Sequence, residues 1–422
     1  MAPIKDHPQR LALTGEMHAR PFPQLAAPSR VAFLAVKPSP DAAPQAELNA
    51  LLAHYGAPRA DASATHYYGE MGRFTLKWEQ HTEFVTYTVI APTGRSLPFA
   101  AADFVAFPED WLADIEGERI TSALLAVLPK PEEDEEIAGY LQDWFVPESL
   151  AVAEVLDGAA VVASDFRIDP AGHLRLALFT DAATGQRRIG RIVQRLCEIE
   201  TYKAMSMLGF MQAREMATAL NDLDGQLSTL MEAMRSGAGT AAEETLHALL
   251  DVSVALEALT AETAYRFAAT GAYEAIVYER ISALREARFM GRQGFGEFMM
   301  RRYAPAMRTV KSTETRLQTI AARALRAADL LRTRVDVERS AQNQAILASM
   351  DRRADLQLRL QHTVEGLSVV AISYYAVSLV GYLLYPLAAP LAVSKGLLTA
   401  LVTLPVVLGV WWTLRHLRRK IG

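Results

Sequence analysis

Charged residues disappear from the C-terminal part of the chain in two long stretches. Residues 367–391 (LSVVAISYYAVSLVGYLLYPLAAPL) and 397–414 (LLTALVTLPVVLGVWWTL) contain no Asp, Glu, Lys, Arg or His. About 20 helical residues cross a hydrocarbon core of about 30 Å, and neither stretch alternates as a barrel strand does. The pattern predicts a transmembrane hairpin over 367–417, with spans at 367–387 and 397–414 joined by a short turn. A buried hydrophobic hairpin in a soluble protein is the other interpretation.

The segment before the first span has heptad spacing. Apolar residues recur every seven positions, and we expect one stalk helix over 306–366 that continues into the span. At about 1.5 Å per residue this helix is about 90 Å long, and it cannot stand alone in water. It therefore packs on preceding helices, on copies of itself, or on both, which favours a homo-oligomer. The heptad comprises Val310, Leu317, Ala324 and Leu331 at one position and Thr313, Ile320 and Ala327 at the other.

The period of the apolar positions changes near Arg187, from about 2 to about 3.6. Residues 1–185 contain short runs rich in Val, Thr, Tyr and Phe, and they predict an α/β domain with a largely antiparallel or mixed sheet. Residues 186–305 predict a helical hairpin that packs on the stalk: one helix over 187–235 and a second from Thr240 to about Met290.

Composition and charge indicate the partners and the cellular location of these parts. The net charge of the 422 residues is −5 and is spread along the chain, so no nucleic-acid partner is implied. The single cysteine, Cys197, excludes an intrachain disulfide framework. The N-terminus has no apolar segment, so we expect no signal peptide. Basic residues flank both spans and Lys395 alone lies between them, which predicts a multi-pass protein of the cytoplasmic membrane with both termini in the cytoplasm.

Hydroxyl groups follow one face of the first span. Ser368, Tyr375 and Tyr382 are seven residues apart, and Ala371, Ser378 and Tyr385 form the interleaved set. In an oligomer this face could line a path for ions. Alternatively, the hydroxyls bond between helices or lie at the membrane interface. Neither span holds an ionisable residue, which disfavours an actively driven transporter.

Three ionisable residues alternate in KWEQHTEFVTYT (77–88). If this segment is one strand, Glu79, His81 and Glu83 share a face and could bind a divalent cation. The other interpretation is a solvated or paired face. No nucleophile or cofactor motif accompanies them, so we do not expect an enzyme.

Two further segments carry candidate ligand groups. Four arginines begin the first long helix and either form ion pairs or hold a phosphate-type ligand. The glycines of GRQGFG (291–296) lie between helices and favour a hinge over a phosphate cradle. The chain has no P-loop, dinucleotide fingerprint or zinc spacing. The four arginines are Arg187, Arg188, Arg191 and Arg195.

Several segments resemble a bacterial family of predicted membrane-anchored proteins of unknown function. They are HPQR (7–10), EMHARPFP (16–23), KWEQHTEFVTYT (77–88) and RIGRIVQRLCEIETYKAMSML (188–208). The resemblance covers essentially the whole chain, and it implies a membrane anchor but no activity.

The layout also resembles the CorA-type magnesium channels, homopentamers whose first span lines the pore. The resemblance implies a cytoplasmic α/β domain, a stalk helix that becomes the first span, a short loop, a second span and a basic tail. That family carries a Gly-Met-Asn filter at the outer end of the first span. Here the corresponding residues begin at Gly381 and read GYLLYP, without the asparagine, so magnesium selectivity does not follow.

These patterns together predict an oligomer, by this resemblance a pentamer, embedded in the lipid bilayer. Its function would be that of a channel for ions or small solutes with a cytoplasmic sensing domain. The alternative is a membrane-anchored scaffold or sensor that does not conduct. We expect no cofactor beyond the divalent cation considered above.

Overall fold

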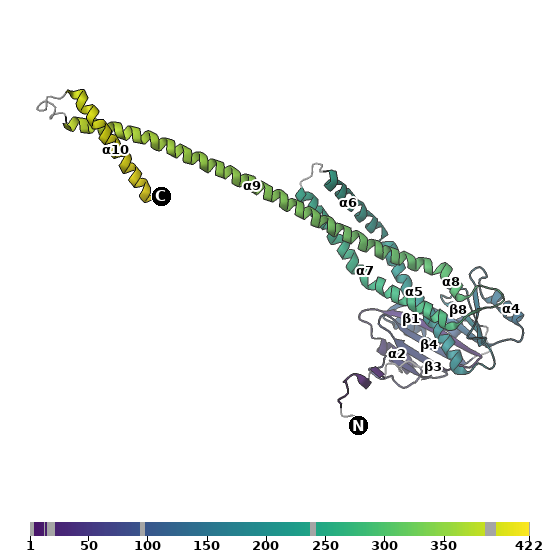
Figure 1. The fold of residues 1–422 in the computed structure, drawn as a ribbon. Coiled ribbons are helices and arrows are strands. Elements are labelled where there is room, and N and C mark those ends of the chain that lie inside the picture. Colours follow the sequence, from purple (N-terminus) through teal and green to yellow (C-terminus); the bar gives the residue numbers. More distant parts are fainter. Residues whose placement is uncertain are drawn as a thin grey trace. The chain divides into compact units, whose positions relative to one another are not determined.

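The computed structural model of the chain describes residues 4–11, 13–14, 22–92, 98–236, 242–384 and 394–421. They form two compact units (Figure 1). The first comprises Met1–Gly239 and His247–Ala327, and the second comprises Thr240–Leu246 and Ala328–Gly422. Helix α9 begins in the first unit and ends in the second.

The first unit is built on a nine-stranded sheet with the order β2-β3-β4-β1-β5-β8-β7-β6-β9. Within the described residues β5 and β8 pair in parallel and the other neighbours are antiparallel, which confirms a mixed, largely antiparallel α/β domain. The strands are β1 (Ser29–Pro38), β2 (His66–Met71), β3 (Phe74–Gln80), β4 (Val85–Pro92), β5 (Gly117–Pro129), β6 (Ala151–Val155), β7 (Ala160–Ser164), β8 (Leu174–Thr180) and β9 (Ala287–Arg288).

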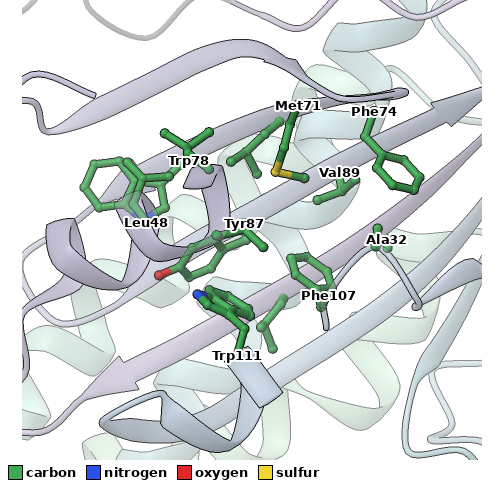
Figure 2. Packing of buried hydrophobic residues seen from close by; sticks show 14 of the residues in the cluster. Ala32, Leu48, Met71, Phe74, Trp78, Tyr87, Val89, Phe107 and Trp111 are labelled. Carbon is green, nitrogen blue, oxygen red and sulfur yellow. The ribbon is translucent and has the colours of Figure 1, made fainter. Parts of the chain in front are cut away.

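One face of the β2-β3-β4-β1 half of the sheet is an apolar core. Alternate residues of the strands meet α2 (Pro44–His54) and α3 (Glu109–Asp114) there, as Figure 2 shows. The rings of Tyr87 and Trp111 lie 5.1 Å apart, and the indole N–H of Trp111 donates to the carbonyl oxygen of Glu47 at 2.8 Å. A second, smaller apolar core lies between α4 (Asp134–Trp144) and the strands β6, β7 and β8.

The opposite face of the same strands is mixed: it is apolar on β1 and largely polar on β3 and β4. In β3, Phe74, Leu76 and Trp78 belong to the apolar core, so the alternation of the strand turns Lys77 and Glu79 to the other side. That side meets the helix α5 (Gln186–Glu215). The sheet is therefore covered on both faces, and its second interface contains charged groups.

Four further helices lie wholly or in part in the first unit: α6 (Ala217–Ser236), α7 (Ala242–Leu284) from His247 onward, α8 (Phe295–Arg302) and the first part of α9 (Ala304–Leu384). On α6, Asp224 accepts hydrogen bonds from Arg316 at 3.0 Å and Arg323 at 3.1 Å of α9. Six of the seven predicted heptad residues are buried by other parts of the chain; they are Val310, Leu317, Ile320, Ala324, Ala327 and Leu331.

Two helix predictions need correction. The helix predicted over 187–235 is divided at Met216 into α5 and α6, although neither glycine nor proline marks the break. The helix predicted to reach about Met290 ends at Leu284. There Arg285 has a left-handed φ of 47°, and Ala287 and Arg288 join the edge of the sheet as β9. This long-range pairing ends the helix, and local propensity does not reveal it.

The second unit contains the end of α9 and the helix α10 (Lys395–Ile421). Both contain a segment long and apolar enough to cross a membrane. In the view of Figure 1, α10 begins near the end of α9 and crosses it. The predicted turn at Pro386 and Pro390 lies outside the described residues.

The least exposed residues of the two helices indicate which side of each helix is partly shielded from solvent. On α10 these residues recur every four positions, which makes a ridge along one side. On α9 they include the small residues Ser373 and Ala376, which allow close approach. We call these two sets the hairpin contact. It comprises Val369, Ser373, Ala376, Val377, Val380 and Leu384 of α9, and Leu398, Val402, Val406, Val410 and Leu414 of α10. Ser378 and Gly381 of α9 are half-buried as well, but the helical period places them on other sides of the helix.

Candidate functional site

The three candidate metal ligands do not share one strand face. Strand β3 ends at Gln80 and β4 begins at Val85, so the segment between them is a turn and the expected alternation stops. Glu79 faces α5, whereas His81 stacks on Phe84 with ring centroids 4.4 Å apart. No group of three His, Cys, Asp or Glu side chains within the described ranges is placed to hold a metal ion.

Glu83 binds to α7 instead of a metal. Its carboxylate accepts hydrogen bonds from both terminal nitrogens of Arg266, one of them at 3.2 Å, and from the hydroxyl of Tyr273 at 2.5 Å. The side chains of Glu83 and Arg266 are 7% and 13% exposed. Burial, and then the hydrogen bond to Glu83, raise the pKa of Tyr273 above its usual range, so its hydroxyl remains a donor.

A second polar chain joins the sheet to α5 and α7. The Lys77 ammonium lies 3.0 Å from the Glu79 carboxylate and donates to the amide oxygen of Gln194 at 2.7 Å. The Gln194 amide donates to Glu198 at 2.7 Å, and Arg280 of α7 also pairs with Glu198. Positive and negative groups alternate along this chain, so each buried charge has a partner of the opposite sign.

We call these groups, together with the Glu83 cluster, the sheet–helix network. Its partners on α7 are Arg266, Tyr273 and Arg280, which sequence analysis did not single out. In the chain, Arg266 and Tyr273 lie 183 and 190 residues from Glu83. Arg280 lies 82 residues from Glu198. No local pattern in the sequence marks such partners.

A small cavity lies beside this network, between the sheet and α5. Its volume is about 30 Å³, and Lys77 and Thr88 of the sheet, Val193 and Cys197 of α5 and also Pro23 line it. One water needs about 10–15 Å³ of such space, so the cavity holds roughly two. These lining residues come from three of the segments that carry the family resemblance. The cavity between them has room for water but not for an organic ligand.

A wider hollow of about 600 Å³ opens next to this cavity and shares His81, Phe84 and Tyr202 with it. Its other lining residues include the amides of Gln45 and Gln80. Among the described residues, the lining contains aromatic rings, amides and hydroxyl groups and no carboxylate. Such a lining can bind a neutral polar molecule, because the rings stack on it and the polar groups form hydrogen bonds with it.

Cys197 is fully buried among these groups. Burial, and then the nearby Glu198 carboxylate, raise the pKa of its thiol far above the usual range. Because the thiolate is the reactive form, we expect no labelling of the native protein by iodoacetamide at pH 8 and full labelling in denaturant, measured by mass spectrometry. Rapid labelling of the native protein would contradict the packing of α5 on the sheet.

Three of the four arginines at the start of α5 contact protein groups. Arg188 donates to the carbonyl oxygen of Leu156 at 2.6 Å, and Arg195 donates to that of Ala283 at 3.0 Å. Arg191 lies 6.0 Å from the ring centre of Phe22. These contacts favour a structural role over the phosphate site considered for them.

The glycine segment 291–296 does not cradle a phosphate either. The carboxylate of Glu286 accepts hydrogen bonds from the backbone N–H groups of Phe295 at 2.8 Å and Gly296 at 2.7 Å. The chain's own carboxylate therefore occupies the N-terminus of α8, which is where an anion would bind.

The candidate pore residues lie on α9, on the side away from the hairpin contact. Tyr375 and Tyr382 are 68% and 78% exposed, and Gly381 is half-buried. The hydroxyls of Ser368 and Ser378 donate to carbonyl oxygens of their own helix, those of Val364 at 2.8 Å and Tyr374 at 2.9 Å. Tyr385 lies outside the described residues. Of the described hydroxyl-bearing residues, Ser368, Tyr375 and Tyr382 are exposed and Ser378 is half-buried.

Comparison with known proteins gives a family but no activity. Neither the curated proteins nor the solved structures yielded a match, so the resemblance to CorA-type channels finds no support there. The profile of a family described as "Protein of unknown function (DUF3422)" matches residues 5–421. This match includes both structural units and agrees with the predicted uncharacterised family. The chain therefore belongs to the DUF3422 family.

Proposed function

We propose that the protein is a membrane-anchored scaffold or sensor, which holds its sheet-containing unit at the cytoplasmic face of the cytoplasmic membrane. The observation that carries the proposal is the exposure of the two apolar segments. Only 6% of the apolar window in α9 and 0% of that in α10 is buried within the chain. The core helix of a soluble protein would bury most of such a segment, whereas lipid would cover it in a membrane.

The basic flanks support an orientation for this anchor. Arg352, Arg353 and Arg359 precede the first span, and Arg415 and Arg418 follow the second. Positive residues stay on the cytoplasmic side, so both long helices would enter from the cytoplasm. Ser394, between the two spans, would then lie on the outer side.

Cysteine labelling tests both parts of this proposal. In a Cys197→Ser background, we expect Ser394→Cys to react with a membrane-impermeant maleimide added to intact spheroplasts. Ser340→Cys, on an exposed stretch of α9, should react only after lysis. The full-length protein should also remain with the membranes after carbonate washing. Recovery in the soluble fraction, or labelling of Ser340→Cys from outside, would contradict the anchor or its orientation.

A second candidate function, permeation of ions or small solutes, is supported by one observation. The hydroxyl-bearing face of α9 is free of the hairpin contact, so it could face a central path between copies. The backbone-bonded serines weigh against this candidate, because their hydroxyls already have acceptors within the helix.

Solute flux into liposomes distinguishes the two candidates. If this face lines a path, Tyr382→Ala should change the flux several-fold and Tyr382→Phe should change it less. The control is Leu383→Ala, at an equally exposed neighbour on another side of the helix, which should leave the flux unchanged. Absence of flux for every ion from protein that is correctly inserted favours the scaffold or sensor.

A further inference from the structure

An uncovered apolar stripe runs along α9 just before the first span. Counted in heptads, residues 346–367 place apolar side chains at five of the seven positions that form a coiled-coil seam. We call these five residues the stalk seam. They are Ile346, Met350, Leu360, Val364 and Leu367, and each is more than half exposed.

The charges of this segment lie on the other sides of the helix. Arg353 is the one charged residue at a seam position, and the positions that flank the seam on either side carry none. A stripe wider than the seam itself is typical of a helix that touches more than one neighbour. The remaining charged or titratable residues are Asp351, Arg352, Asp355, Arg359, His362 and Glu365.

The stalk seam continues into the first span in the same heptad register. The next seam positions are Ala371, Tyr374, Ser378 and Gly381, and Tyr375 and Tyr382 lie immediately beside them. The hairpin contact uses other positions of the same turns; of the continuing seam positions, Ala371 and Tyr374 are exposed, and the small residues Ser378 and Gly381 are half-buried. One largely exposed face therefore extends from the stalk into the span.

We propose that copies of this same chain cover this face, so that parallel α9 helices associate along the stalk seam and its continuation in the membrane. The inference rests on the membrane anchor proposed above.

The occupant must meet two conditions that a second copy fulfils. It must offer an apolar stripe both in water and in lipid, which a soluble partner cannot do. It must also match the register over about five heptads, and copies anchored in one bilayer are parallel and level with one another. A straight helix drifts about 20° per heptad from the seam, so the associated helices would wind into a left-handed supercoil.

Two seam positions are not apolar: one holds Gln357 and the other holds the charged Arg353. Like charges would face one another there, which weakens the assembly but restricts its register, as a single polar seam residue does in coiled coils. We expect Arg353→Leu to strengthen association.

Cysteine crosslinking in membranes of the full-length protein tests the proposal. In the Cys197→Ser background, Met350→Cys and Val364→Cys should each form disulfide-linked dimers on mild oxidation. The control is Ala348→Cys, at an exposed position on the opposite side of the helix, which should crosslink at most weakly. Equal crosslinking at all three positions, or none at the two seam positions, would overturn the proposal.

A pair of charge substitutions gives an independent measurement. Leu360→Glu should reduce the mass of the particle in detergent to that of a single chain, measured by light scattering. Leu358→Glu is the matched control, because Leu358 is 56% exposed against 65% for Leu360 but lies off the seam. If Leu360→Glu makes the protein monomeric but leaves it in the carbonate-washed membrane, the seam is needed for association and not for anchoring. An oligomer that survives Leu360→Glu would overturn the proposal, whereas loss of the parent protein from membranes would instead contradict the anchor.

Discussion

Replacing Glu83 by alanine is expected to lower the free energy of unfolding by about 3–5 kcal/mol, because it leaves a buried guanidinium without its counter-charge. The carboxylate accepts hydrogen bonds from Arg266 and Tyr273 of α7. Its removal therefore costs the hydrogen bonds of the β3–β4 turn to both of these residues. Urea unfolding of the full-length protein in detergent, followed by tryptophan fluorescence, measures the loss.

A matched control for this substitution is Glu232→Ala. Glu232 also forms two hydrogen bonds with an arginine, Arg235, but both side chains are well exposed to solvent. We expect no measurable change there, since exposed ion pairs contribute little. If Glu83→Ala were as mild as the control, the Glu83 cluster would not hold the turn on α7.

Replacing Gly209 by leucine is expected to cost about 1–3 kcal/mol through overpacking. A Cβ atom at this position of α5 would lie 2.1 Å from the hydroxyl oxygen and 3.0 Å from the Cβ of Thr270 on α7. The two helices would have to separate, which disturbs the sheet–helix network as well. The same urea experiment measures the loss.

Gly271→Leu is the control for this second substitution. Gly271 also lies within a helix, next to Thr270, but a Cβ atom there meets nothing within 4 Å. Leucine should stabilise α7 at this position by up to about 1 kcal/mol, because it restricts the unfolded chain more than glycine does. The two substitutions therefore differ in sign, and an equal effect of both would show that α5 and α7 do not pack closely at Gly209.

Much of the sheet could be predicted, because its strands have strong local patterns. The run VAFLAV (31–36) lies in β1, and the run 120–128 lies in β5. Both are buried and rich in apolar residues, as the central strands of a covered sheet are. Strand β9 could not be predicted in this way. It has two residues, and it exists only because β6 presents an edge to which they pair.

The candidate site in the sheet was predictable only in part. The sequence singled out Glu79, His81 and Glu83 as ionisable residues in a strand-rich segment, but it placed them on one strand. The β3–β4 turn separates them, and the partners of Glu83 come from a helix more than 180 residues away in the chain, at separations of 183 and 190. Charge balance in a buried site depends on such distant partners.

The sequence by itself determined the features that depend on one helix at a time: two apolar segments, their basic flanks and the heptads of α9. These follow from local composition and period, since a helix fixes which residues share a face. Only the tertiary structure decided what covers each face. It buried six of the seven heptad residues from Val310 to Leu331, and it left the stalk seam and most of the two apolar segments exposed. Burial depends on neighbours brought together by the whole chain, and no local pattern encodes them.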